Sequence, residues 1–258
     1  MSGIGPNHDK QFGHSMQKTN LDQSSVFGVP EQDAAAPFGR VSKGSLSLRT
    51  YRVIRDGLAA GSFEPEQRLI LQEIADQIGT SITPVREACL RLVSEGALEY
   101  RSGRFAQVPA FTKERYLSVR LVRMPLEGLA AKLAAERATV DELQRIKEIQ
   151  EAYRSLHLPE DRLLARQKNI EFHFMVYRAS REDVLVSHIE RLWVMMGPML
   201  GRYFQDAIQS YRGDDAHDNV IDAIADRNGK NAEKAIVSDL MRGGDELLRL
   251  LDAQESTH

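Results

Sequence analysis

Four polar side chains in the C-terminal half have the types and the spacing of a metal-binding set. Asn169 and His173 are four residues apart, so on a helix they share one face. His217 lies eleven residues before Asn228 and Asp239 lies eleven residues after it, and Asn228-Gly229 is typical of a turn. Two antiparallel helices leaving that turn would bring His217 and Asp239 level, about 16 Å from it at the helical rise per residue.

An amide oxygen, two imidazoles and a carboxylate that project into a helical bundle suit a divalent cation such as zinc, nickel or manganese. Two other interpretations are open at this point. The four residues could line a cavity that binds an organic ligand without metal, or they could be unrelated polar residues on the surface.

A second group of side chains, near residue 80, is typical of a DNA contact. The segments Gln72 to Ile78 and Thr83 to Leu92 have the spacing of a helix-turn-helix, whose second helix enters the major groove. Ser81, Thr83 and Arg86 would be exposed at the start of that helix, and Arg86 could grip a guanine or a phosphate. A hairpin tip at Gly103-Arg104 would act as a wing. The spacing alone also allows an ordinary three-helix unit with a solvated arginine.

The elements that must hold these residues follow from the spacing of apolar side chains. The pattern predicts a winged helix-turn-helix at 44–109, with three helices and a hairpin at 98–108, after a disordered tail at 1–43. An all-α antiparallel bundle follows at 110–254, with a kink at Gly197-Pro198. The predicted fold is thus mainly α, and its bundle helices lie near 112–137, 140–157, 160–180, 182–212, 214–227 and 230–253.

Composition narrows the class of protein. The chain has 258 residues and a net charge of −3, whereas residues 40–110 carry ten Lys/Arg and eight Asp/Glu, a sign that suits DNA at this end. A single cysteine, Cys89, excludes an intrachain disulfide, and the spacing places it on the inner face of the second DNA-binding helix, where it would pack. We find no apolar run of transmembrane length and no apolar signal-peptide core, so we expect a cytoplasmic protein without a membrane partner.

Residues 47–254 resemble the GntR family of transcription regulators, in the FadR-type branch that carries a helical FCD ligand domain. The segment from Ile74 to Ala88 follows the family's helix-turn-helix signature, and the segments 61–69, 92–97 and 123–130 also match. We expect a homodimer that reads an inverted repeat, because a twofold protein favours a palindromic operator, and that responds to a small carboxylate effector. Repressor is the commoner role among proteins that resemble this one. The resemblance implies DNA contacts at Gln72, Ser81, Thr83, Arg86 and the wing residues Gly103 and Arg104.

The resemblance also sharpens the metal prediction, because many members bind a divalent metal through an aspartate and three histidines at these spacings. Here Asn169 stands at the aspartate position and Asp239 at the last histidine position, while His173 and His217 match. The formal charge of the set, −1, is unchanged by the double replacement, which argues for a retained site. Arg123 belongs to the family's Arg-x-x-Leu-Glu motif and could pair with an effector carboxylate; an interface or surface ion pair is the alternative.

Two departures and two competing functions complete the interpretation. Ile82 stands where the family usually has arginine, and Gln72 where many members have arginine or glutamate, so the operator is expected to differ from the family norm. An enzyme built on a di-metal bundle would need two Glu-x-x-His motifs, which the chain lacks. Ile82 alone favours an adaptor without DNA recognition.

The stretch Trp193, Met195, Met196 and Met199 is interpreted as core or cavity wall.

Overall fold

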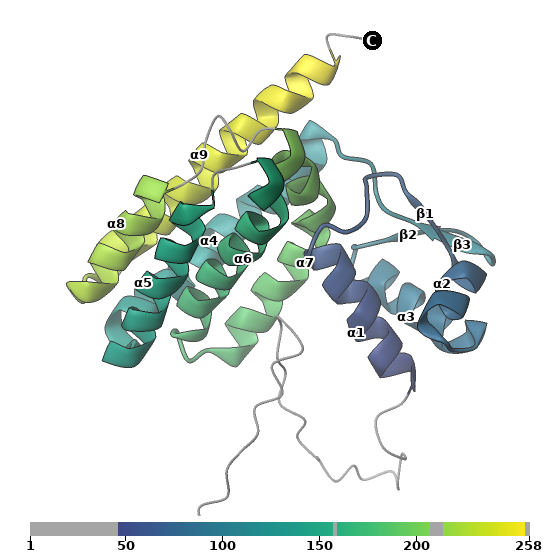
Figure 1. The fold of residues 1–258 in the computed structure, drawn as a ribbon, viewed down its shortest axis with the longest axis horizontal. Helices are drawn as coiled ribbons and strands as arrows, with labels where there is room; N and C mark the ends of the chain where they lie inside the picture. Colours follow the sequence, from purple (N-terminus) through teal and green to yellow (C-terminus); the bar gives the residue numbers. More distant parts are fainter. Residues whose placement is uncertain (1–45, 157–158, 207–213, 256–258) are drawn as a thin grey trace, which may run out of the picture.

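The computed structural model describes residues 46–156, 159–206 and 214–255, so the tail predicted for 1–43 lies outside the described residues. An N-terminal head, residues 46–108, packs against one side of a larger helical bundle (Figure 1). The fold is mainly α, as predicted.

The head contains α1 (Leu46–Ala59), β1 (Arg68–Ile70), α2 (Leu71–Ile78), α3 (Ile82–Ser94), β2 (Glu99–Ser102) and β3 (Phe105–Gln107). Gly79 ends α2 in the left-handed conformation, with φ 69°, which a residue without Cβ adopts at little cost. The apolar faces of the three helices meet in one core, made by Tyr51, Ile54, Leu58, Leu71, Val85, Cys89 and Leu92. Cys89 is fully buried in this core, so its side chain packs as predicted, and burial raises the pKa of the thiol to about 11.

The wing is a three-stranded antiparallel sheet in the order β1-β3-β2. The hairpin of β2 and β3 was predicted, and its turn lies at Gly103-Arg104. Strand β1 was not predicted, because it is three residues long and buries only Leu69, which is too short for an alternating pattern. Leu69 pairs with Ala106, which lies 37 positions further along the chain, so only the tertiary fold brings the partner strand to β1.

The bundle contains α4 (Lys113–Arg137), α5 (Val140–Ser155), α6 (Arg162–Arg178), α7 (Asp183–Asp206), α8 (Asp214–Ala225) and α9 (Gly229–Glu255). Their order matches the prediction, and local signals set several starts. Thr112 caps α4, and Thr139 with Glu142 forms a capping box on α5. In the part of the chain that the structure describes, no helix has the length and hydropathy to cross a membrane.

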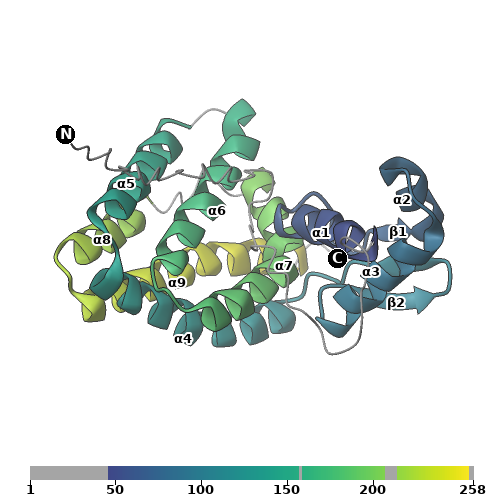
Figure 2. The ribbon, with the colours of Figure 1, turned by 90° about the horizontal axis from the view of Figure 1, so that it is seen from below.

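Helix α4 packs along α9, α8 returns against α9, and α5 lies against both α6 and α8 (Figures 1 and 2). The turn at Asn228-Gly229 therefore joins two antiparallel helices, as the sequence predicts. This arrangement surrounds an interior to which α4, α5, α6, α7, α8 and α9 all contribute buried side chains.

Glycines allow the head and the bundle to approach closely. Helix α7 runs through Gly197 and Pro198 as one helix, and a Cβ at Gly197 would lie 1.8 Å from the backbone oxygen of Leu58 in α1. A Cβ at Gly201 would lie 2.6 Å from the backbone oxygen of Gly61. The buried Arg166 of α6 donates to that same Gly61 oxygen at 3.1 Å. The head thus rests directly on the two helices, α6 and α7, that also line the bundle interior.

Candidate DNA-binding face and metal site

The recognition helix α3 turns its predicted DNA contacts to solvent. Ser81 occupies the N-cap position but makes no side-chain capping hydrogen bond, and Thr83 lies within the first turn. Ser81, Thr83 and Arg86 are all exposed, while Val85, Ala88, Cys89 and Leu92 bury the opposite face. An exposed arginine near the start of such a helix can reach the edge of a guanine or a phosphate.

The other predicted DNA contacts are exposed on the same head. Gln72 lies in the first turn of α2, where its Nε2 donates to Asp76 Oδ1 at 2.8 Å. Gly103 and Arg104 are exposed at the tip of the β2–β3 hairpin. Helices α2 and α3 and the sheet together form one end of the molecule (Figure 2). The head therefore presents polar and cationic side chains from three elements where a duplex could approach.

Three of the four predicted metal ligands meet inside the bundle. His173 comes from α6, His217 from α8 and Asp239 from α9, and one ligand atom of each lies within 4.8 Å of the others. His173 Nε2 is 3.4 Å from Asp239 Oδ2. The three side chains are buried, with exposed fractions of 3%, 0% and 8%. Two antiparallel helices that leave a shared turn place His217 level with Asp239, as the spacing predicts.

The fourth predicted ligand, Asn169, lies one turn before His173 on α6 and is half-buried. Its distance from His173 along the helix agrees with a shared face. Its part in metal binding stays a prediction.

Both histidines are held in the neutral form that metals bind. Burial lowers the pKa of His217 to about 3. Burial, the ring of His217 and the charge of Arg123 lower the pKa of His173 well below its usual value. His217 Nε2 is buried and has no hydrogen-bond partner within the described structure. An unpartnered buried nitrogen beside a second imidazole and a carboxylate fits a divalent cation, which would satisfy all three ligand atoms.

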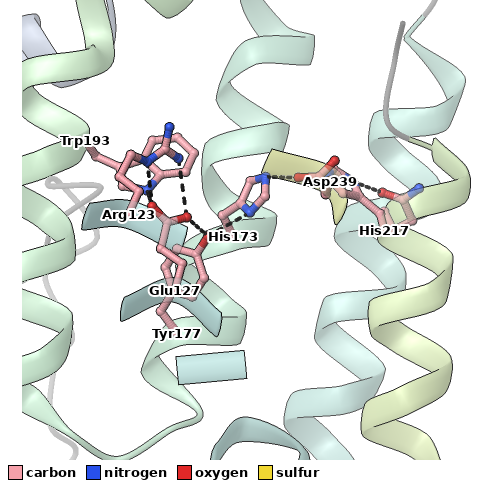
Figure 3. A network of polar contacts seen from close by, with 8 residues as sticks. Arg123, Glu127, His173, Tyr177, Trp193, His217 and Asp239 are labelled. Carbon is pink, nitrogen blue, oxygen red and sulfur yellow. Dashed lines mark hydrogen bonds and ion pairs between the residues drawn. The ribbon is translucent and has the colours of Figure 1, made fainter. Parts of the chain in front are cut away.

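A buried ion pair lies beside this cluster (Figure 3). Arg123 Nε donates to Glu127 Oε1 at 2.6 Å, and the guanidinium stacks 4.8 Å from the Trp193 ring centroid. Trp193 Nε1 donates to the same Glu127 oxygen at 3.2 Å, and Tyr177 Oη donates to Glu127 Oε2. Arg123 is therefore in an ion pair inside the bundle and not, as the alternative had it, at an interface or on the surface. Direct effector contact stays a prediction. Trp193, Met196 and Met199 are buried, as predicted, and Met195 is partly buried.

The sequence predicted no role in this interior for Tyr177 or Gln150, and no polar partner for Glu127 or Trp193, although two of the four carried a signal. Glu127 follows Arg123 by four residues, and Tyr177 follows His173 by four, so each pair shares a helix face. Trp193 was assigned to the core, but its indole N–H was not assigned a partner. Gln150, which contacts His217 Nδ1 at 2.7 Å, lies on a different helix, and no spacing in the sequence connects the two.

Known proteins agree with this architecture. Residues 46–108 match the family described as bacterial regulatory proteins, gntR family, and residues 119–241 match the FCD domain. The HTH-type transcriptional regulator McbR of Escherichia coli (strain K12) is 35% identical over 170 residues, which span 66% of this chain and 76% of that protein. A Paenarthrobacter nicotinovorans protein named "Probable D-xylose utilization operon transcriptional repressor" is 30% identical over 167 residues, 64% of this chain and 72% of that one.

A solved structure supports the same conclusion for the fold. The structure of E. coli McbR/YncC superposes with a TM-score of 0.73 at 27% sequence identity, and the match covers 81% of this chain and 99% of that one. Its coverage extends across both the head and the bundle. The exposed recognition helix, the wing and these relatives lead to one conclusion: the chain belongs to the GntR family, in the branch that carries an FCD domain, and is a DNA-binding transcription regulator rather than an enzyme.

Proposed function

We propose that this regulator is a homodimeric repressor that leaves an inverted-repeat operator when a small carboxylate binds inside its bundle at a divalent metal. The observation that carries the proposal is the buried cluster of His173, His217 and Asp239. The bundle that holds it touches the head through α6 and α7, so a change there has a short route to the DNA-binding helices. Release requires only that the effector bind more tightly to the DNA-free arrangement.

The metal would be held by His173 Nε2, His217 Nε2 and a carboxylate oxygen of Asp239, with the amide oxygen of Asn169 as a weak fourth ligand. Zinc, nickel and manganese are the candidates, because each accepts mixed nitrogen and oxygen ligands. Such a cation supplies a Lewis acid that can bind a carboxylate oxygen. Two neutral imidazoles and one carboxylate leave a divalent ion with a positive charge, which favours an anionic effector.

Arg123 enters this proposal through its ion pair. An effector carboxylate that paired with Arg123 would have to replace Glu127, whose carboxylate also accepts hydrogen bonds from Tyr177 and Trp193. Exchange of one carboxylate for another would keep the bidentate geometry of the guanidinium and would alter the contacts of α6 and α7. The repressor role is supported by the name of the P. nicotinovorans relative.

The homodimer is supported by the outer face of α4. Four large apolar side chains lie exposed along it: Leu117 at 37%, Leu121 at 72%, Val122 at 46% and Leu129 at 43%. A twofold contact uses the same patch on both copies, so one apolar helix face can bury itself against its equivalent. Leu121→Glu is expected to shift the dimer toward monomer in light scattering, whereas Val140→Glu, another exposed apolar site, is not.

The test starts from untagged protein purified without chelators. Elemental analysis is expected to find about one divalent metal per chain, and selection from random DNA is expected to yield an inverted repeat. Small carboxylic acids are then screened for loss of binding to that DNA in a mobility-shift assay. Metal at background, with no thermal shift on adding zinc, nickel or manganese, would refute the metal site. Tighter operator binding with every acid would refute release by effector.

A further inference from the structure

Each histidine of the cluster has its second ring nitrogen bonded to a buried side chain outside the cluster. His217 Nδ1 lies 2.7 Å from Gln150 Oε1, and His173 Nδ1 lies 3.0 Å from Tyr177 Oη. Gln150 is 2% exposed and Tyr177 is fully buried. Each of these contacts constrains which ring nitrogen can carry the proton of a neutral imidazole.

The proton of Tyr177 has a fixed destination. The Glu127 carboxylate accepts it, and the same carboxylate is held by Arg123 at 2.6 and 3.3 Å and by Trp193 at 3.2 Å. The hydroxyl has a single proton, and the hydrogen bond to Glu127 Oε2 uses it. The phenol oxygen can then only accept from the imidazole, which places the proton of His173 on Nδ1 and a lone pair on Nε2.

The same logic applies to His217. The amide oxygen of Gln150 accepts but cannot donate, so a bond of 2.7 Å requires a proton on Nδ1. The ring is also held in place by Phe172, which stacks on it at 3.9 Å between centroids with an interplanar angle of 17°. The lone pair of His217 is therefore on Nε2, the nitrogen that has no partner within the described structure.

We infer that Gln150 and Tyr177 are positioning residues that hold both histidines as Nδ1–H tautomers, so that both Nε2 lone pairs face Asp239. Outer partners of this kind orient metal-ligating histidines and raise metal affinity. Arg123 and Glu127 act on His173 indirectly, through Tyr177, because their ion pair fixes the direction in which Tyr177 donates (Figure 3). The inference rests on the proposed metal site for its purpose, but the tautomers themselves do not require a metal.

The first test is spectroscopic and uses full-length protein labelled with ¹⁵N-histidine and stripped of metal, at neutral pH. Long-range ¹H–¹⁵N correlation spectra are expected to show His173 and His217 as Nδ1–H tautomers. Tyr177→Phe is expected to change the tautomer of His173 only, and Gln150→Met that of His217 only. His188, exposed on α7, serves as an internal reference in each spectrum. The inference would be overturned by Nε2–H tautomers in the unmutated protein, or by tautomers that stay the same in both variants.

The second test measures zinc affinity by competition with a chromophoric chelator. Tyr177→Phe and Gln150→Met are each expected to weaken zinc binding about 10- to 100-fold. Gln150→Glu keeps an accepting oxygen and is expected to restore most of the affinity. Gln144→Met, an exposed glutamine on the same helix, is the matched control. If the unmutated protein binds no zinc while the tautomers behave as expected, the metal proposal fails. If it binds zinc but the variants match it, the positioning role fails.

Discussion

The DNA-binding head and the polar interior of the bundle hold their functional side chains in opposite ways. Ser81, Thr83 and Arg86 come from one short stretch and point into solvent, so each can be changed with little effect on its neighbours. The interior draws side chains from several helices and buries them in shared hydrogen bonds. An exposed recognition surface tolerates change in its residues, whereas a buried polar network must be satisfied as a whole.

This comparison predicts that the largest loss of stability follows a change at Glu127. Glu127→Gln would leave the guanidinium of Arg123 buried, only 5% exposed, without an anionic partner. Removal of one partner of a buried ion pair costs about 3–5 kcal/mol, so we expect a large fall in the free energy of unfolding in urea. The matched surface change, Asp218→Asn, breaks the exposed pair with Arg154 and is expected to cost less than about 1 kcal/mol. Equal effects in the two variants would remove the distinction between interior and surface.

The junction between the two regions is the next place to test the comparison. Gly197→Ala places a methyl group 1.8 Å from the Leu58 backbone oxygen, so α1 or α7 must shift. Overpacking of this kind costs about 1–3 kcal/mol. We expect a lower melting temperature and altered operator affinity, with zinc binding unchanged because the His173–Asp239 contact lies elsewhere. Gly103→Ala, at the open tip of the wing, controls for the loss of a glycine in the melting temperature only, because Gly103 is itself a predicted DNA contact; a Cβ there has one neighbour, at 4.0 Å.

On the head the expected effect is on binding and not on stability. Arg86→Ala is expected to weaken operator binding about 10- to 100-fold or abolish it, because a bidentate base contact contributes about 1–3 kcal/mol. Its unfolding free energy should stay within about 0.5 kcal/mol of the unmutated protein, because the side chain is exposed. Arg145→Ala, exposed on α5, is the control in the same mobility-shift assay. Full sequence-specific binding by the Arg86 variant would contradict the assigned recognition surface.

The smallest predicted effect is a loss of DNA affinity after a change in the wing. Arg104→Ala should reduce binding about equally for specific and unrelated DNA, because a wing arginine meets the backbone and reads no base. The slope of log affinity against log salt concentration is expected to fall by about one phosphate contact. A change confined to one operator sequence would mean instead that Arg104 reads a base edge.

Much of the head and of the helix order was predictable, because the signals are local. Apolar spacing predicts which helix faces are buried, and Gly79 and the Gly103-Arg104 turn mark where elements end. Strand β1 is the exception, because its signal is not local. Its one buried residue acquires a partner only when β3 folds against it.

Part of the metal site was predictable for the same reason. The four-residue spacing on α6 pairs Asn169 with His173, and the symmetric spacing about Asn228-Gly229 pairs His217 with Asp239, because both depend on regular helices. The resemblance to the GntR family joined the two pairs into one predicted set, and the packing of α6 against the other helices brings His173 to the second pair. The ion pair of Arg123 was harder, because its partner Glu127 is four residues away but its burial depends on α6 and α7 packing over it.

The sequence by itself determined the regular elements, the face that each buries and the exposed arginine of the recognition helix, because these depend on residues a few positions apart. Only the tertiary structure decided that Gln150 meets His217, that Tyr177 joins Glu127 to His173, and that α1 rests on Gly197. Contacts between distant segments depend on how whole helices pack, and no spacing within one segment encodes that packing.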